Sequence, residues 1–298
     1  MKAKNSAFIQ ILMEDLEVYI LSDGSFGIGT PQPILAPEIE KEIVSDALKA
    51  LYLSEDDYKL PISTLLIRKG NRNILVDTGE GYHNPKSAGW LQNSLTEIGI
   101  FPEDITDILI THAHRDHIGG ILSREDERIY PNADYYISAQ ELNFWTSEEK
   151  DFSYSKMPAD SYPNGLLQKK TLSVIKDRLN IFHPGDILFS CIQTQAAPGH
   201  TPGHIIFNIF SGKQSITHIV DVVHSPLLIR YPEWGTRWDV NFDQGIATRK
   251  QVLEDCYLNK TLVTTCHLPW PGIGYIDKIQ DQWQWIPKAF SDPFRIKI

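Results

Sequence analysis

Four side chains that can bind metal ions fall within six consecutive positions of this sequence. They are His112, His114, Asp116 and His117, in the run Thr-His-Ala-His-Arg-Asp-His-Ile-Gly-Gly at 111–120. Imidazole is the commonest metal ligand in proteins, and carboxylate is its natural partner for a hydrolytic divalent cation. The structural alternative is a histidine-rich surface loop, but further potential ligands later in the chain favour a metal site.

Three more residues of these types follow strand-like runs. His200 lies in Ala-Pro-Gly-His-Thr-Pro-Gly-His (197–204), where proline and glycine favour a tight loop. Asp221 follows the apolar run 216–220, and an aspartate among β-branched residues is costly to bury unless it is paired or binds a metal. His267 follows another such run. Because each stands at or near the end of a predicted strand, the three could converge on the first cluster.

The spacing within these motifs agrees with shared metal binding. His112 and His114 are two positions apart, so both can point to the same side of an extended chain. His117 would turn toward a second metal once the chain leaves the strand. Cys266 is adjacent to His267 and would point away from it, so we interpret this cysteine as a small buried hydrophobic residue rather than a ligand.

The segments that must position these residues alternate between strand-like and helix-like patterns. Apolar runs bounded by turn residues predict strands at 18–21, 65–68, 73–76, 108–110, 134–138, 186–194, 205–210 and 215–223. Apolar residues at helical spacing predict helices at 37–51, 87–98, 139–146, 166–179 and 243–258. The Gly- and Pro-rich segment 25–37 is expected to be a loop.

The complete motif set resembles the metallo-β-lactamase superfamily. The resemblance rests on His112-x-His114-x-Asp116-His117, then His200, Asp221 and His267 in chain order, with Asp77-Thr78-Gly79 upstream. It implies an α/β fold, a four-layer αββα sandwich with metals at one edge of the sheets. By resemblance to the binuclear members, one metal would be held by His112, His114 and His200. The second would be held by Asp116, His117 and His267, and Asp221 would bridge both.

The implied activity is hydrolysis that depends on two divalent metal ions. Two such ions can share a bridging water and lower its pKa, so that hydroxide attacks a carbonyl carbon or phosphorus. Asp116 could orient this nucleophile or shuttle its proton. Zinc suits mixed imidazole and carboxylate ligation best, although manganese, iron and cobalt are feasible.

Asp77 has two interpretations. It follows the apolar run at 73–76 and precedes Thr78-Gly79, so it could simply form a turn. In the functional interpretation it accepts an N–H from a metal-binding histidine and so fixes the tautomer of that ring. Loss of such a contact costs roughly ten- to a hundredfold in metal affinity or activity.

The substrate is inferred from the resemblance alone. We expect one domain over residues 1–298, with an N-terminal extension around 25–60 and an insertion around 142–182 that covers the pocket. Aromatic residues there and near the end of the chain predict an apolar pocket wall of Trp145, Phe152, Tyr154 and Trp270, unless these side chains pack internally. The sequence is most similar to the group holding N-acyl homoserine lactonases and methyl parathion hydrolase-like enzymes, which implies a lactone, ester or phosphotriester with an apolar body.

Three other functions use a similar scaffold. A glyoxalase II-like thioesterase shares the ligand set, but such enzymes usually carry a basic C-terminal helical region for glutathione. An iron-dependent oxidoreductase of the persulfide dioxygenase type is the second alternative; the di-iron branch usually has Glu where this chain has His114. The third is a non-catalytic binding protein, which the complete ligand set disfavours.

Composition limits the partners and the compartment. The net charge of −10, from 28 basic and 38 acidic residues, disfavours nucleic-acid binding, so we expect a small-molecule substrate. Cys191, Cys256 and Cys266 give no disulfide framework, which favours a cytoplasmic location. The apolar run 9–13 is too short for a signal peptide, and no stretch approaches the length of a membrane span. The family resemblance also implies a homodimer.

Overall fold

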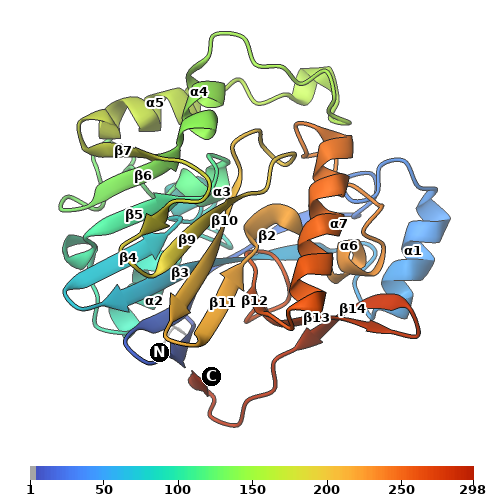
Figure 1. Cartoon of the computed structure of the whole chain (residues 1–298). Coiled ribbons are helices and arrows are strands. Elements are labelled where there is room, and N and C mark those ends of the chain that lie inside the picture. Colours follow the sequence, from blue (N-terminus) through green and yellow to red (C-terminus); the bar gives the residue numbers. More distant parts are fainter. Residues whose placement is uncertain (1–4) are drawn as a thin grey trace.

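Two β-sheets lie face to face in the computed structural model of the chain, which describes residues 5–298 (Figure 1). Within this range the first sheet has eight strands, in the spatial order β15 (Arg295–Lys297), β1 (Phe8–Leu12), β2 (Glu17–Gly29), β3 (Tyr58–Lys69), β4 (Arg72–Val76), β5 (Asp107–Ile110), β6 (Asp134–Ser138) and β7 (Leu179–Phe182). The second has seven, in the order β14 (Gln282–Pro287), β13 (Ile273–Ile279), β12 (Leu262–Thr264), β11 (Gln214–His218), β10 (Ile205–Ser211), β9 (Ile192–Ala196) and β8 (Ile187–Leu188).

Strands that are apolar on both faces explain why helices cover the outside of the sheets. In β2, Val18 and Ile20 belong to the core between the sheets, whereas Leu21 belongs to the core under the helices outside the first sheet. In β10, Phe207 faces the core between the sheets and Ile206 faces the core on the other side. Because side chains alternate along a strand, each sheet buries both faces, and the chain forms four αββα layers.

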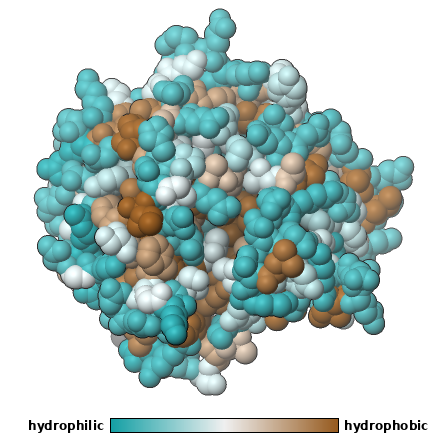
Figure 2. Space-filling view, viewed as in Figure 1, coloured by the Kyte–Doolittle hydropathy of each residue, from teal (hydrophilic) through white to brown (hydrophobic). Residues whose placement is uncertain are grey.

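Seven α-helices lie within the described part of the chain. They are α1 (Lys41–Ala50), α2 (Leu91–Glu97), α3 (Arg115–Ile118), α4 (Ala139–Thr146), α5 (Leu166–Ile175), α6 (Pro226–Arg230) and α7 (Phe242–Leu258). Figure 1 shows α4 and α5 beside the first sheet, and α6 and α7 beside the second. No helix in residues 5–298 is long and apolar enough to cross a membrane. On the face shown in Figure 2, apolar residues form separate patches within a mainly hydrophilic surface.

Several predicted boundaries were wrong. The helix predicted at 37–51 begins only at Lys41, and the segment predicted as a loop from residue 25 is still strand β2 as far as Gly29. The helix predicted at 166–179 ends at Ile175, and Leu179 already opens strand β7.

Two long predicted strands are shorter in the structure. The strand predicted at 186–194 is broken into β8 and β9, because Phe189 and Ser190 have positive φ angles of 52° and 60° that extended chain does not allow. The strand predicted at 215–223 ends at His218, and a short 3₁₀ turn, Val220–Val222, follows it. This turn carries Asp221 out of the sheet.

Four strands end at the same edge of the sandwich. β4 pairs in parallel with β5 in the first sheet, and β11 pairs in parallel with β12 in the second. The segments that leave these strands carry Asp77, His112, Asp221 and His267 respectively. Since the carboxyl ends of parallel strands lie on one side, this topology brings side chains far apart in sequence to one place.

Backbone hydrogen bonds join the two sheets at this edge. The amide of Ile205, which opens β10, donates to the carbonyl oxygen of Thr111 after β5 at 3.1 Å. The amide of Ser63 in β3 donates to the carbonyl oxygen of Cys266 after β12, also at 3.1 Å. The loops that carry the predicted ligands are therefore fixed to each other by the main chain.

Candidate metal centre

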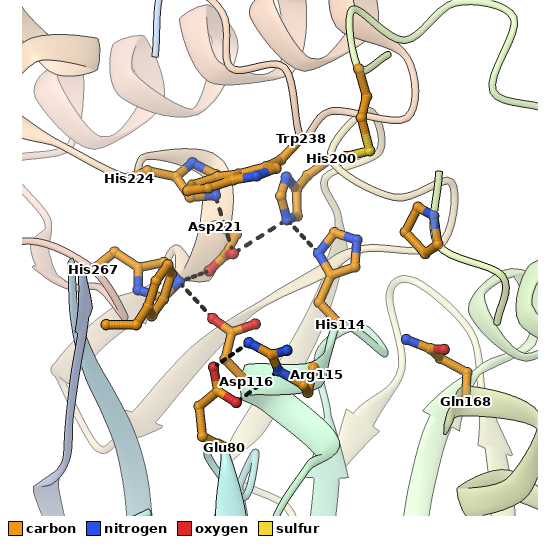
Figure 3. A pocket seen from close by; sticks show the side chains of 13 residues that line it. Glu80, His114, Arg115, Asp116, Gln168, His200, Asp221, His224, Trp238 and His267 are labelled. Carbon is orange, nitrogen blue, oxygen red and sulfur yellow. Dashed lines mark hydrogen bonds and ion pairs between the residues drawn. The ribbon is translucent and has the colours of Figure 1, made fainter. Parts of the chain in front are cut away.

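A cavity of about 380 Å³ opens at the edge where these strands end (Figure 3). Its polar side is formed by the loops after the strands, and its apolar side comes from more distant segments. The lining residues are Phe26, Glu80, His114, Arg115, Asp116, Met157, Pro163, Gln168, His200, Asp221, His224, Trp238 and His267. An apolar wall with a few convergent polar groups is typical of a small-molecule site.

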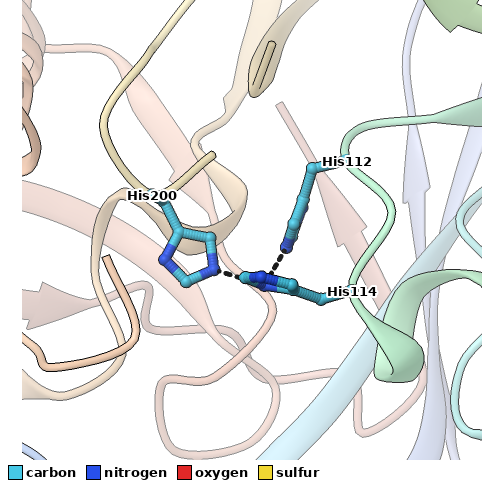
Figure 4. Close-up of side chains that lie close together, drawn as sticks. All are labelled: His112, His114 and His200. Atoms are coloured by element: carbon cyan, nitrogen blue, oxygen red, sulfur yellow. Dashed lines mark hydrogen bonds between the residues drawn. The ribbon is translucent and has the colours of Figure 1, made fainter. Parts of the chain in front are cut away.

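Three histidines converge on one side of this cavity. His112 and His114 follow β5, and His200 lies in the loop between β9 and β10. Nε2 of His112 lies 3.1 Å from Nδ1 of His114, which in turn lies 2.9 Å from Nε2 of His200 (Figure 4). Burial, and then the charge of neighbouring histidines, lowers the pKa of His112 and His114 well below the ordinary value. Both rings are therefore neutral, with a lone pair available for a cation.

A second group lies next to the first. Asp116 and His117 belong to the short helix α3, and His267 follows β12. Oδ2 of Asp116 lies 3.6 Å from Nε2 of His117 and 3.3 Å from Nε2 of His267. This set of two imidazoles and a carboxylate again combines ligand types that suit a hydrolytic divalent cation.

Asp221 lies between the two groups. Its Oδ2 is 3.7 Å from Nε2 of His112, 3.3 Å from Nε2 of His200 and 3.4 Å from Nε2 of His117. Its Oδ1 is 3.3 Å from Nε2 of His267. The structure thus brings together all seven side chains that the sequence pattern singled out.

The donor set fits divalent cations. Nε2 of His117 and Oδ1 of Asp221 are buried without a hydrogen-bond partner in the described chain, which is costly unless another group satisfies them. Burial lowers the pKa of His200 and His267, but neighbouring carboxylates, Asp221 above all, outweigh it and raise the pKa to about 9 and about 10. The carboxylates therefore attract positive charge, which bound cations can supply instead of protons.

Asp77 stands directly behind this centre. Its Oδ2 accepts a hydrogen bond from Nδ1 of His117 at 2.7 Å. Thr111 donates its amide to Oδ1 at 2.9 Å and its hydroxyl to Oδ2 at 2.7 Å. Asp77 also turns the chain, with a φ of 60°, so it has the features of both interpretations. The contact with Nδ1 leaves Nε2 of His117 directed at the centre.

Two other ligand histidines have similar partners. Nδ1 of His200 donates to Oδ1 of Asp239 at 3.0 Å, and the buried guanidinium of Arg249 lies 3.5 Å from the other oxygen of Asp239. Nδ1 of His267 donates to the carbonyl oxygen of Pro61 at 2.7 Å. With one nitrogen held in this way, the second nitrogen of each ring faces the cavity with a fixed orientation.

A buried glutamate connects the two loops that carry the first histidine group. Oε1 of Glu141 accepts from the amide of Ala113 and the indole Nε1 of Trp145, both at 2.7 Å. Its Oε2 accepts from the hydroxyl of Thr201 at 2.6 Å and the amide of Gly203 at 3.2 Å. A side chain at Gly203 would place Cβ 2.1 Å from the amide nitrogen of Glu141, so only glycine permits this approach.

Sequence reasoning missed three residues at this centre, namely Glu141, Asp239 and His224. Each is a single polar residue outside any motif, and their proximity to the ligands is set only by the fold. Nε2 of His224 lies 3.2 Å from Oδ2 of Asp221, and its ring lies 5.5 Å from that of His267 at 11°. Neither ring nitrogen of His224 has a hydrogen bond within residues 5–298. Burial lowers its pKa to about 4, so this imidazole is neutral.

None of the four aromatic residues predicted for the pocket wall is among the residues that line this cavity, although the ring of Trp145 lies 5.8 Å from that of His114. Trp145 and Phe152 are buried, and the ring of Phe152 stacks on Tyr162 at 4.7 Å. Tyr154 is 66% exposed and Trp270 is 38% exposed, and neither lines the cavity. The apolar wall is instead made by Phe26, Met157, Pro163 and Trp238. Met157, Pro163 and Gln168 do belong to the segment 142–182 that was expected to cover the pocket.

Comparison with known proteins agrees with this arrangement. The sequence model of the metallo-beta-lactamase superfamily matches residues 57–262. The chain is 32% identical over 128 residues to metallo-beta-lactamase domain-containing protein 1 of Mus musculus. It is 30% identical over 144 residues to hydroxyacylglutathione hydrolase of Pectobacterium carotovorum. These matches cover 43% and 48% of this chain, but only 35% and 41% of the two relatives.

Two solved structures match nearly the whole chain. One is AidC, a dizinc quorum-quenching lactonase in complex with the product N-hexanoyl-L-homoserine, with a TM-score of 0.89 and 33% identity over 97% of this chain and 100% of AidC. The other is AbOPH, a hydrolase in the beta-lactamase superfamily, with a TM-score of 0.86 and 28% identity over 96% of this chain and 99% of AbOPH.

Proposed function

Because this chain belongs to the metallo-beta-lactamase superfamily, we propose that it is a hydrolase that holds two divalent cations and cleaves a lactone, ester or phosphotriester with an apolar body. The observation that carries the proposal is the convergence of seven imidazole and carboxylate groups around Asp221, beside a cavity with an apolar wall. The similarity to a dizinc lactonase over almost the entire chain makes a lactone the first substrate to test.

Two sets of side chains would hold the cations. One set is His112, His114 and His200, the other is Asp116, His117 and His267, and Asp221 would be shared. The chemistry that these residues would gain from bound cations is a water molecule of lowered pKa and polarisation of the carbonyl or phosphoryl oxygen of the substrate. Zinc is the metal best suited to this mixture of imidazole and carboxylate.

Two residues of the chain are placed to handle protons and oxygens of the substrate. The side chain of Asp116 is 16% exposed and lines the cavity, whereas that of Asp221 is 3% exposed. Asp116 would accept the proton of the attacking water and pass it to the leaving oxygen. His224 also lines the cavity, and the single N–H of its neutral ring would donate a hydrogen bond to a substrate oxygen.

The apolar side of the cavity would hold the body of the substrate. Phe26 and Trp238 contact each other, with ring centroids 6.2 Å apart, and the ring of Phe26 also lies 5.9 Å from that of the ligand His267. Burial of an acyl or alkyl chain against these rings excludes water from the reacting group and contributes about 25 cal/mol per Å² of apolar surface.

The proposal is tested by metal analysis and a substrate panel on the purified protein. We expect close to two metals per chain by mass spectrometry, and hydrolysis of lactones, aryl esters or phosphotriesters that is lost in His200→Ala. The matched control is His183→Ala, a substitution of an exposed histidine away from the cavity, which keeps both metals and activity. One metal per chain, unchanged in Asp221→Ala, would contradict the shared site.

A second candidate, a thioesterase, is favoured by one comparison. The match to a hydroxyacylglutathione hydrolase places glutathione thioesters in the same panel, although it covers less than half of that enzyme. A kcat/KM for a glutathione thioester above those for all lactones and esters would replace the first proposal by this one. Iron bound in the purified protein, with persulfide oxidation, would instead identify the oxidoreductase alternative.

A further inference from the structure

An arginine lies among the metal-binding residues at the cavity, and we propose that it determines specificity. In this proposal the guanidinium of Arg115 donates hydrogen bonds to a second oxygen of the substrate, the carbonyl oxygen of an amide next to the group that is cleaved. The inference rests on the proposed hydrolase function and deepens it, because it separates N-acylated lactones from lactones that carry only an alkyl chain.

The position of Arg115 places it within reach of the substrate. It stands between the predicted ligands His114 and Asp116, at the first position of α3. Its side chain lines the cavity and is 55% exposed. Figure 3 shows the guanidinium beside Asp116, on the side of the cavity opposite Trp238.

A buried carboxylate holds this guanidinium in a fixed orientation. Nε of Arg115 donates to Oε2 of Glu80 at 2.8 Å, and its Nη2 donates to Oε1 at 3.1 Å. Glu80 is almost fully buried, and its amide donates to the buried carboxylate of Asp23 at 2.8 Å. The paired hydrogen bonds of the fork remove most of the rotamer freedom of the arginine, so little entropy is lost when it binds a ligand.

This arrangement leaves donors of Arg115 unused. Nη1 has no hydrogen bond to any residue in 5–298, so both of its N–H groups remain available. A guanidinium held rigidly at the wall of a cavity with free donors suits an oxygen acceptor on a bound molecule.

Arg115 is the only arginine or lysine among the described residues that line the cavity. Phe26, Met157 and Trp238 give the opposite side its apolar character. Gln168 also lines the cavity, but it carries no charge, and its Nε2 donates to the carbonyl oxygen of Ala113 at 2.9 Å. An alkyl lactone fills such a cavity without using Arg115, whereas an amide beside the ring offers the oxygen that the arginine can bind.

The test compares two lactones in the purified, metal-containing protein. N-hexanoyl-homoserine lactone and an α-alkyl-γ-butyrolactone of equal chain length share the scissile ester and differ in the amide. In Arg115→Met we expect the ratio of their kcat/KM values to fall about 10- to 100-fold, as for a hydrogen bond from a charged donor. The matched control is Arg124→Met, because Arg124 lies over Tyr82 and does not line this cavity. In the control the ratio stays as in the wild type.

Unpairing the buried carboxylate of Glu80 could disturb folding, so a second variant is needed. Glu80→Gln/Arg115→Met removes both charges and should show the same fall in the ratio, with metal content and circular dichroism unchanged. Arg115→Lys keeps the charge without the fork and should recover part of the ratio. An unchanged ratio in both methionine variants would overturn the inference, even if lactones are good substrates.

Measurements of ligand affinity distinguish a failure of this inference from a failure of the proposed hydrolase function. Affinities for N-hexanoyl-homoserine, and for the same hydroxy acid without the amide, are measured by tryptophan fluorescence. A loss of about tenfold or more for the first acid alone in Arg115→Met supports recognition of the amide, whereas an equal loss for both acids would contradict it. If wild type hydrolyses no lactone but this loss is seen, the hydrolase proposal fails and the role of Arg115 stands. Equal affinities in wild type, Arg115→Met and Arg124→Met would refute that role.

Discussion

Oδ2 of Asp77 lies 2.7 Å from Nδ1 of His117, and Nε2 on the other side of the same ring lies 3.4 Å from Oδ2 of Asp221. The imidazole thus stands between a carboxylate that fixes its tautomer and one that lies at the centre of the site. Asp77 also accepts two hydrogen bonds from Thr111. An asparagine there would present an N–H to groups that already donate.

We therefore expect Asp77→Asn to lower metal affinity in the group that contains His117, by about 10- to 100-fold. The reason is that the substitution weakens the contact that orients the ring. Competition with a chromogenic chelator measures the affinity of each site. Asp57→Asn, at an exposed position, is the control and should bind both metals normally. If Asp77→Asn also bound both metals with normal affinity, Asp77 would act only as a turn residue.

Glu141→Gln should destabilise the fold and the first histidine group together. The carboxylate accepts four hydrogen bonds, and replacing one oxygen by an amino group leaves two buried donors without an acceptor. The expected cost is roughly 2–4 kcal/mol in the free energy of unfolding, measured with urea. Exposed Glu149→Gln should change it by less than about 0.5 kcal/mol. Equal urea midpoints for the two variants would argue against this role of Glu141.

His224→Ala is expected to lower kcat by about 10²-fold without loss of metal, because one donor to the substrate oxygen is removed. His224→Gln, which restores an N–H in the cavity, should recover part of this loss. The measurements are steady-state kinetics together with metal content for each variant. If activity and metal are lost in parallel, His224 is needed for the metal site rather than for the substrate.

We expect protonation of His218 in the unfolded chain to lower the free energy of unfolding at acid pH. Burial lowers the pKa of this residue from 6.5 to about 3, and its ring forms a 3.0 Å hydrogen bond with the hydroxyl of Thr264. Between these pH values the unfolded chain binds one more proton than the folded chain. The free energy of unfolding therefore decreases as pH falls through 6.5 toward 3, by ~1.4 kcal/mol per pH unit from this residue.

His218→Gln should lose this pH-dependent part, so its stability relative to wild type rises as the pH is lowered from 6.5 to 5. Urea unfolding at several pH values measures the difference in the free energy of unfolding between the two proteins. Metal release contributes equally to both proteins, so its contribution cancels in this difference. The exposed His183→Gln serves as the control and should follow the wild type. A pH-independent difference between wild type and His218→Gln would rule this contribution out.

The ligand motifs made the family and the four-layer fold predictable from sequence, and both are confirmed. This worked because the ligands follow short apolar strands whose carboxyl ends meet at one edge. Strand β6 and helix α4 were predicted with correct bounds, since an N-cap serine, Ser138, marks the boundary between them.

The pocket wall was not predictable in the same way. Composition indicated aromatic residues in the segment 142–182, but it could not separate Trp145, whose indole is held by Glu141, from Met157, which lines the cavity. Strand β14 was missed although Gln-Trp-Gln-Trp alternates with the period of a strand. The expected homodimer and the cytoplasmic location stay predictions.

Two kinds of segment line the cavity, and they differ in how substitutions in them would affect the site. Its metal-binding groups follow strands that main-chain hydrogen bonds tie together, whereas Met157 and Trp238 come from loops between helices. Substitutions in those loops can alter which molecules fit without moving the cation-binding groups. The architecture is therefore suited to acquiring new substrates by gradual mutation, and a library confined to the loops is the natural starting point for directed evolution.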